Sequence, residues 1–298
     1  MQRTTFQTTN GTGLNHDSLP MRLWQKAKKY GIWNPNDIDL SQDKEDWKNL
    51  TELEKDAIFR LTSVFQGGEE SVTLDLLPLI MVIAKEGRLE EELFLTSFLW
   101  EEAKHVDGFN RIMNEVFGGT PDLSSYHTPS YKKIFHEELP TALNRLTTDS
   151  SPVAQAIASV TYNMIVEGVL AETGYYTYHK ALKANNIFPG TVEFVAKLKQ
   201  DESRHIAYGI YLLSRLVAEH GDPVWEAIEQ RMDELFEPAI GFISESLLVY
   251  GDDMPFGIDV EATLEYAMGQ FQKRMARIER ARQQNLKELQ EEVFSSTL

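Results

Sequence analysis

Apolar residues recur at intervals of three and four along most of the chain, and no segment alternates with the period of two that a half-buried strand shows. The first long run begins at Thr51 and Glu54, which have the spacing of a helix-capping box. Its apolar positions follow the period of an α-helix: Ala57, Leu61, Val64, Phe65, Val72, Leu76 and Leu79. The pattern predicts an all-α fold.

Glycine and proline divide the chain into separate helices. After a short helical pattern at 21–29, helices are predicted over residues 51–85, 89–117, 131–146, 152–184, 191–220, 224–250 and 260–293. Gly67-Gly68 and Pro78 interrupt the first of the long ones. Either is expected to bend that helix, or the glycines are expected to let another group approach its backbone closely. Two helix pairs of similar length are joined by one long connection, which is the connectivity of ferritin-like four-helix bundles.

Composition narrows the class of protein. At 42% hydrophobic, 298 residues suffice for a large core, but no stretch approaches the roughly 20 apolar residues of a transmembrane helix. Residues 1–20 are polar and lack the apolar core of a signal peptide, so we expect a cytoplasmic protein. The formal net charge of −17 argues against a nucleic-acid partner. Because cysteine is absent, any metal must be held by oxygen and imidazole.

A repeated motif carries the chemistry. Glu102 and His105 form one Glu-x-x-His, and Glu202 and His205 form another; residues three apart lie on one face of a helix. One further acid inside an apolar run precedes each motif. This order of acids and histidines resembles that of di-iron and di-manganese carboxylate proteins. The predicted metal ligands are Glu69, Glu102, His105, Glu167, Glu202 and His205.

Charge explains why such a cluster needs metal. Four carboxylates converging inside a bundle would each cost several kcal/mol if unpaired, whereas two divalent cations cancel them. Six oxygen and imidazole ligands leave open positions on two metals, which suits iron or manganese and oxygen chemistry. Asp201 and Glu101 are candidates to hold the outer ring nitrogens of the two histidines, Asp201 more so. Lys104 and Arg204 are expected to form salt bridges on the outside.

The resulting domain prediction is a single ferritin-like domain over residues 1–298. It consists of an N-terminal arm at 1–50, the metal-binding bundle core at 51–220 and additional C-terminal helices at 221–298. Tryptophans of the arm are expected to pin it to the bundle by packing.

At the motif residues, nearly the whole chain resembles the small, radical-generating subunit of ribonucleotide reductase. It is still more similar to the related ligand-binding oxidases. The segments that carry this resemblance are Trp33-Asn34-Pro35, Gly68-Glu69-Glu70, Glu102-Ala103-Lys104-His105, Tyr162-Asn163-Met164-Ile165-Val166-Glu167-Gly168, and Asp201-Glu202 with His205.

The resemblance implies a manganese–iron cofactor, with manganese nearer Glu69 and iron nearer Glu167. It also implies a homodimer, a long-chain fatty acid whose carboxylate bridges the metals, and an ether cross-link between Val72 and Tyr162 made by oxygen activation. Val72 follows Glu69 by three residues and so faces the metals, and its Cβ is tertiary. Tyr162 precedes Glu167 by five residues, which is poorly phased for an α-helix, so its approach does not follow from the spacing.

Phe109 helps to distinguish the possible functions of the protein. It stands four residues after His105, where many reductase small subunits carry a radical tyrosine. Phenylalanine fits an oxidase, but also the tyrosine-free manganese–iron reductase subunits. The last tyrosine is Tyr266, whereas a reductase tail usually contains one, and this favours an oxidase acting on a hydrophobic substrate. A reductase subunit is the second interpretation, and metal storage in a ferritin-like shell is the third.

Overall fold

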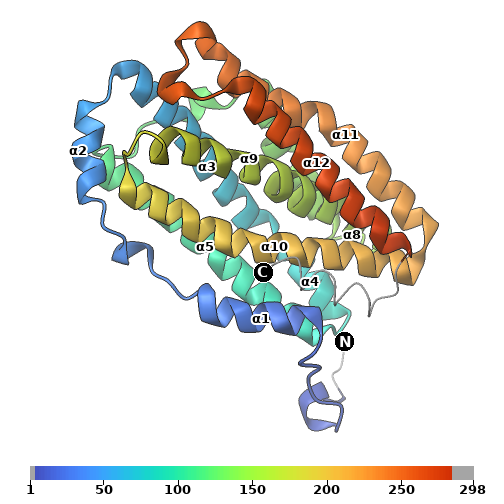
Figure 1. Ribbon diagram of the computed structural model, residues 1–298. Coiled ribbons are helices and arrows are strands. Elements are labelled where there is room, and N and C mark those ends of the chain that lie inside the picture. Colours follow the sequence, from blue (N-terminus) through green and yellow to red (C-terminus); the bar gives the residue numbers. More distant parts are fainter. Residues whose placement is uncertain (1–3, 284–298) are drawn as a thin grey trace.

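The computed structural model describes residues 4–283, and within that range the chain contains helices and no strand (Figure 1). The α-helices are α1 (Leu19–Tyr30), α2 (Ser41–Asn49), α3 (Glu52–Asp75), α4 (Leu77–Lys85), α5 (Leu89–Val116), α6 (Pro129–Lys132), α7 (Leu139–Arg145), α8 (Pro152–Ser159), α9 (Glu172–Tyr178), α10 (Pro189–His220), α11 (Asp222–Leu247) and α12 (Val260–Gln283). The all-α prediction is confirmed. The part of the last predicted helix beyond residue 283 lies outside the described residues.

Shorter helical segments connect or extend these helices. The π-helical segments are η4 (Lys133–Glu138), η5 (Val160–Ala171) and η6 (His179–Lys183). The 3-10 turns are η1 (Gln7–Thr9), η2 (Pro35–Asp37), η3 (Ser124–Tyr126), η7 (Leu248–Asp253) and η8 (Pro255–Gly257).

Four long helical elements form the bundle. They are α3, α5, the continuous helix from α8 to η6, and α10. Helix α1 packs against α5 and α10, while α11 and α12 cover η5 (Figure 1). Apolar side chains such as Phe94, Phe98 and Leu212 are fully buried between these elements, and each contributes roughly 1.5–3 kcal/mol by leaving water. The predicted ferritin-like bundle with additional helices is thus present.

The break in the first long helix lies at Leu76 and not at Gly67-Gly68. Pro78 is the second residue of α4, where its missing N–H is harmless, and the ring prevents α3 from continuing. Of the two alternatives for the glycines, the bend is absent and the close approach is present. A Cβ at Gly67 would lie 2.4 Å from the hydroxyl of Tyr131. The predicted capping box of Thr51 and Glu54 is present.

The helix from Pro152 to Lys183 is long and apolar enough to cross a membrane by length and composition alone. However, 89% of its apolar window is buried inside the protein. A core helix has the same composition because it is surrounded by other helices on all sides. Its hydrophobicity is therefore explained by its central place in the bundle.

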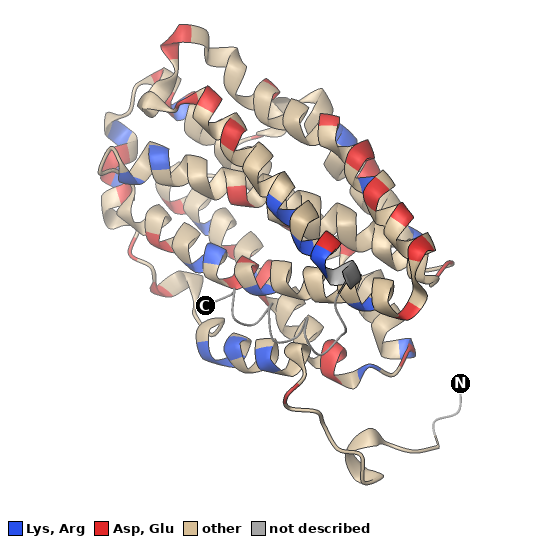
Figure 2. Cartoon of the chain, turned by 45° about the vertical axis from the view of Figure 1, so that its right-hand side comes forward, with Lys and Arg blue, Asp and Glu red and all other residues tan. Residues whose placement is uncertain are grey.

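Charge is distributed unevenly over the surface. Figure 2 shows acidic residues on most helices, whereas lysine and arginine gather on α1. The basic residues of α1 are Arg22, Lys26, Lys28 and Lys29. The negative net charge therefore has a local exception on the side of the bundle that α1 covers.

Candidate metal centre

The six predicted ligands meet in the middle of the bundle. Glu69 comes from α3, Glu102 and His105 from α5, Glu167 from η5, and Glu202 and His205 from α10. None is more than 5% exposed. Their nitrogen and oxygen atoms form two groups within 4.8 Å, one of Glu69, Glu102, His105 and Glu202, the other of Glu102, Glu167, Glu202 and His205. Glu102 and Glu202 belong to both groups, as ligands that bridge two ions would.

Buried atoms without hydrogen-bond partners point to what the cluster holds. The Nδ1 atoms of both histidines accept no hydrogen bond, and one carboxylate oxygen each of Glu102, Glu167 and Glu202 is likewise unpaired. His105 Nδ1 lies 3.4 Å from Glu69 Oε2, and His205 Nδ1 lies 3.2 Å from Glu102 Oε1. Buried polar atoms are normally satisfied, so an unpaired set this close together fits a pair of cations.

Protonation of the metal-free cluster supports the same conclusion. Burial raises the pKa of Glu69 to about 8, despite the opposing effect of His105. Burial also raises the pKa of Glu167 well above its ordinary value, and the nearby Glu202 adds to this. Without cations the site therefore takes up protons to limit its negative charge, and cations can replace those protons.

The outer nitrogens of the two histidines are held by a second pair of acids. His105 Nε2 lies 3.3 Å from Asp201 Oδ2, and His205 Nε2 lies 2.8 Å from Glu101 Oε2. A carboxylate at Nε2 places the ring proton there and leaves the Nδ1 lone pair directed at the cluster. Both acids therefore orient histidines, and both were candidates from the sequence, Asp201 the stronger of the two.

Lys104 and Arg204 point inward, so the expectation of outward salt bridges is wrong. Arg204 Nη2 donates to Glu101 and to Asp201, each at 2.5 Å, and Lys104 Nζ donates to Asp201 at 2.9 Å. Both cations are at most 7% exposed. Two buried acids beside a cluster of four more need this compensation, because an unpaired buried carboxylate is costly.

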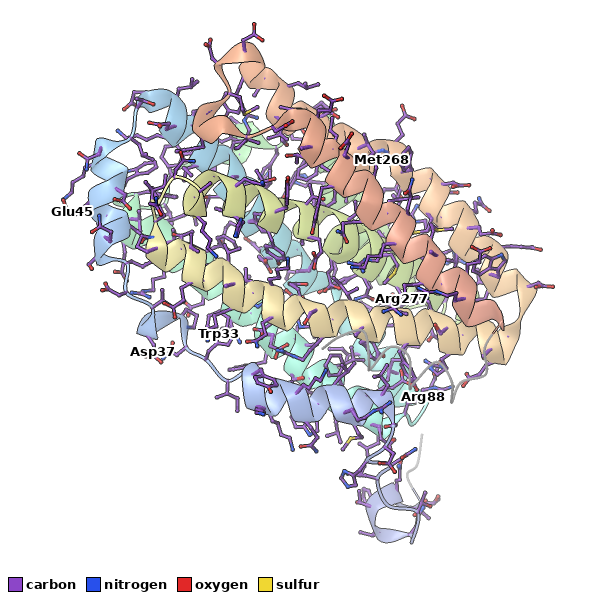
Figure 3. All side chains as sticks on the ribbon, in the orientation of Figure 1. Trp33, Asp37, Glu45, Arg88, Met268 and Arg277 are labelled. Atoms are coloured by element: carbon purple, nitrogen blue, oxygen red, sulfur yellow. The ribbon has the colours of Figure 1, made fainter. Side chains whose placement is uncertain are left out.

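Trp33 extends this network to the N-terminal arm, beside α10 in Figure 3. Its indole Nε1 donates to Asp201 Oδ2 at 2.9 Å, and its ring stacks on His105 with centroids 6.3 Å apart. Lys104 Nζ lies 4.0 Å from the centroid of the same ring. The arm therefore contributes a hydrogen bond to the site as well as packing. The sequence of the arm predicted only the packing.

Val72 and Tyr162 come together beside the cluster. The hydroxyl of Tyr162 lies 3.2 Å from Glu102 Oε1 and 3.3 Å from the carbonyl oxygen of Val72. Both side chains are buried, and burial among the carboxylates raises the pKa of Tyr162 well above its usual value. The phenol thus keeps its proton and donates it toward the cluster.

The reason Tyr162 reaches the site is the π-helical geometry of η5. Hydrogen bonds in a π-helix join residues five apart, so Tyr162 and Glu167 are far better aligned than in an α-helix. Asn163 also faces the cluster, and its Nδ2 donates to Glu167 Oε2 at 2.9 Å. The sequence analysis missed Asn163, although its spacing of four from Glu167 was an available signal.

An apolar cavity leads away from the four carboxylates. Its volume is about 100 Å³, several times the roughly 10–15 Å³ that one water needs. Val64, Leu61 and Ala57 line it along α3, Leu170 and Gly174 line it along η5 and α9, and Ile243 and Leu247 line it along α11. An acidic closed end with apolar walls suits a ligand that has a polar head and a hydrocarbon chain.

Two aromatic residues complete the surroundings. Tyr175 is buried and stacks on Phe65, and its hydroxyl has no hydrogen-bond partner. No feature of the sequence marked Tyr175. Phe109 is fully buried and packs between Phe65 and Phe194. The position that carries a radical tyrosine in many reductase subunits is here an apolar contact.

Comparison with known proteins now identifies the family. The model of the ribonucleotide reductase small chain matches residues 19–279. The chain belongs to the ribonucleotide reductase small-chain family. It is similar to the structure of an R2-like ligand-binding oxidase with aerobically reconstituted Mn/Fe cofactor, at 41% identity over 93% of this chain and 98% of that one, with a TM-score of 0.89.

Variants of such an oxidase are equally similar. Its Y162F and E69D mutants, both with aerobically reconstituted Mn/Fe cofactor, are each 40% identical over 93% of this chain and 99% of theirs, with TM-scores of 0.89. Within the small-chain family, this member therefore groups with the R2-like ligand-binding oxidases. It is an oxidoreductase of the oxidase kind.

Proposed function

We propose that this family member is an oxygen-activating oxidase that holds one manganese and one iron ion, with manganese nearer Glu69 and iron nearer Glu167. It binds a long-chain fatty acid at the metals, forms an ether link between Val72 and Tyr162, and oxidises a hydrophobic substrate. The observation that carries the proposal is the pair of overlapping ligand groups at the closed end of an apolar cavity. The Mn/Fe cofactor of the similar oxidases supports the choice of metals.

The charge of the site agrees with this occupancy. Four carboxylates neutralise two divalent ions, and both histidines can then stay neutral because their outer nitrogens donate to Glu101 and Asp201. When bound, the two metals supply redox chemistry with dioxygen. Oxidation adds positive charge to the site, and the carboxylate of a fatty acid offers the negative charge that balances it.

The side chains around the site have separate tasks. Asp201 and Glu101 orient the histidines, while Lys104 and Arg204 balance the charge of these two acids. The apolar wall, which includes Val72 and Phe65, excludes water from the reacting groups. Tyr162 holds its proton against Glu102, so the phenol oxygen is already beside the segment that it would join.

The cross-link balances as a two-electron oxidation. One hydrogen leaves the Cβ of Val72, the other leaves the hydroxyl of Tyr162, and a Cβ–O bond replaces them. This step releases two electrons and two protons. The Mn(II) and Fe(II) that the six carboxylate and histidine ligands would hold would supply two further electrons, and solvent would supply two further protons, which together reduce one dioxygen to two molecules of water. The 3.3 Å contact between the hydroxyl of Tyr162 and the carbonyl oxygen of Val72 supports this pairing.

Reconstitution of metal-free protein with Mn(II), Fe(II) and oxygen tests the proposal. Peptide mapping should find the segments of Val72 and Tyr162 covalently joined and lighter by two hydrogens. Tyr162→Phe should lose the link and retain both metals, because Tyr162 is not a proposed ligand. Lipid extraction and mass spectrometry of the purified protein should recover a long-chain carboxylic acid.

Two results would contradict the proposal. Unlinked peptides from protein whose metals are demonstrably oxidised would remove the cross-link. Synthesis of deoxynucleotides in the presence of a reductase large subunit would assign the chain to the radical-donating subunits instead.

Glu102→Ala and His205→Ala should each bind well under two metals per chain, and full occupancy in both would exclude the proposed ligand set.

A further inference from the structure

The outer mouth of the apolar cavity carries a cation. Arg60 is the only lysine or arginine among the residues that line the cavity, and it lies on α3 about 13 Å from Glu69 at roughly 1.5 Å of rise per residue. Tyr250, Met254 and Ile258 line the cavity at the same end. The two ends of the cavity thus differ: the inner end has four carboxylates and the outer end has a guanidinium.

Arg60 is held by aromatic rings and leaves most of its donors available. Its Nε donates to the hydroxyl of Tyr250 at 3.2 Å, and its guanidinium carbon lies 4.9 Å from the ring centroid of Tyr126 and 5.7 Å from that of Tyr250. Among the described residues, no carboxylate forms an ion pair with Arg60, and no hydrogen bond joins its Nη atoms to another group. These two nitrogens form the fork that binds a carboxylate through two parallel hydrogen bonds.

The rings themselves are fixed by one acid. Asp56 accepts a hydrogen bond from Tyr126 at 2.8 Å and another from Tyr250 at 2.7 Å. Both oxygens of Asp56 are therefore engaged by neutral hydroxyls, and the tyrosines stand between this acid and the arginine. Tyr250 belongs to η7, the turn between α11 and α12, which passes over the N-terminal part of α3 (Figure 1). The geometry presents Arg60 to a ligand and keeps it out of a salt bridge.

The rim of the mouth is apolar. Leu247, Met254 and Ile258 belong to the lining of the cavity together with Tyr250. Elsewhere the surface is acidic on most helices (Figure 2). A carboxylate that approaches this protein is repelled over most of its surface, and the mouth offers both a guanidinium for its head and apolar side chains for its hydrocarbon.

We propose that Arg60, framed by Tyr126 and Tyr250, is a capture site for the carboxylate of a long-chain fatty acid on its way to the metals. This inference rests on the proposed function, since it assigns to that ligand an entry route and an entry direction. The acid enters head first, pairs with Arg60 at the mouth and then passes along the apolar wall to the inner end. Because Arg60 contacts the head group only during entry and exit, it governs the rates of both.

Stopped-flow fluorescence with a polyene fatty acid, parinaric acid, tests the assignment on the full-length, metal-loaded and delipidated protein. Arg60→Gln should slow association by about tenfold, the usual scale of a charge-assisted contact. Dissociation should slow by a similar factor, so the Kd should change by less than about twofold, because the final site is unaltered. Arg60→Lys should recover part of the rate.

Two matched controls separate charge capture from structural damage. Arg145→Gln changes the net charge equally at an exposed site on α7, where Arg145 forms an ion pair with Asp149 within residues 4–283, and it should leave both rates unchanged. Parinaryl alcohol, which has the same chain without a carboxylate, should bind wild type and Arg60→Gln at equal rates.

Different negative results would refute the fatty-acid site at the metals or the capture site at Arg60. If the wild type binds no parinaric acid, or binds it equally well after metal removal, the proposed fatty-acid site at the metals fails. If metal-dependent binding is present and Arg60→Gln leaves the association rate unchanged, or slows acid and alcohol alike, the capture site is refuted. If Arg60→Gln weakens the affinity because dissociation does not slow together with association, capture is also refuted. Arg60 would then contact the head group in the final complex, and the head group would stay at the mouth.

Discussion

At the scale of single residues, the metal centre depends on groups that never reach the cluster. Glu101 and Asp201 each hold one histidine, and Arg204 donates to both acids. The two halves of the site are therefore linked through one buried guanidinium. A change in either acid alters the tautomer and the orientation of a histidine, which is a direct route to weaker metal binding.

Glu101→Gln provides the test of this dependence. The amide retains the shape of the side chain but removes the negative charge at His205 Nε2, so metal affinity should fall by about 10–100-fold. Metal content after dialysis against graded chelator concentrations measures the change. Asp107→Asn on the exposed side of the same helix is the control and should bind metal as wild type does. Equal retention in both variants would mean that Glu101 does not support the ligand.

At the scale of elements, the site requires two helices to approach very closely. A Cβ at Gly209 of α10 would lie only 2.2 Å from the Cβ of Asn163 on η5. Asn163 in turn holds Glu167, so the distance between these two helices positions a proposed ligand. Gly209 lies inside a helix, so no turn requires a glycine there. The site requires it, because a side chain would push Asn163 away.

Gly209→Ala should therefore destabilise the protein by about 1–3 kcal/mol, because the added methyl overpacks the contact. Metal content should fall as η5 moves away from α10. Gly269→Ala on α12 is the matched control, since its Cβ would meet nothing within 4 Å, and it should stabilise the helix by about 0.5–1 kcal/mol. Urea unfolding measures both free energies, and destabilisation of the two variants by the same amount would contradict the packing argument.

At the scale of the whole molecule, the cluster couples stability to pH and to metal. In the metal-free protein, burial raises the pKa of Glu69 to about 8 and also raises that of Glu167. Burial lowers the pKa values of both histidines, but the surrounding carboxylates outweigh it and raise them well above the ordinary value. For each of these groups the folded state binds protons more strongly than the unfolded chain does. Their contribution to stability is complete at low pH and is lost as the pH rises through the folded pKa.

The free energy of unfolding of metal-free protein should accordingly decrease as the pH rises from the ordinary glutamate pKa of 4.5 to the raised pKa of Glu69, about 8. Metal affinity should rise over the same range, because cations compete with the departing protons. Urea titrations at several pH values, with and without Mn(II) and Fe(II), measure both trends. Glu69→Gln should flatten the pH dependence of the metal-free protein, and a dependence as steep as that of wild type would assign it to other groups.

The sequence by itself determined the helical class and the bundle and singled out the six candidate ligands, because each of these follows from local spacing and order. Glu102 and His105 share a helix face whatever surrounds them, and a set of buried acids has few stable solutions other than metal. Pro78 likewise marks a helix break by its own covalent structure, although Gly67-Gly68 in the same helix did not cause one.

Only the tertiary structure decided which residues act across helices. Four hydrogen bonds join residues that are far apart in the chain: Lys104 to Asp201, Arg204 to Glu101, Trp33 to Asp201 and Arg60 to Tyr250. Tyr162 depended on the π-helical geometry of η5, which no apolar period revealed because every residue from 160 to 170 is buried. Local spacing places side chains around one helix axis, whereas packing between helices sets the distances at which they bind, donate and react.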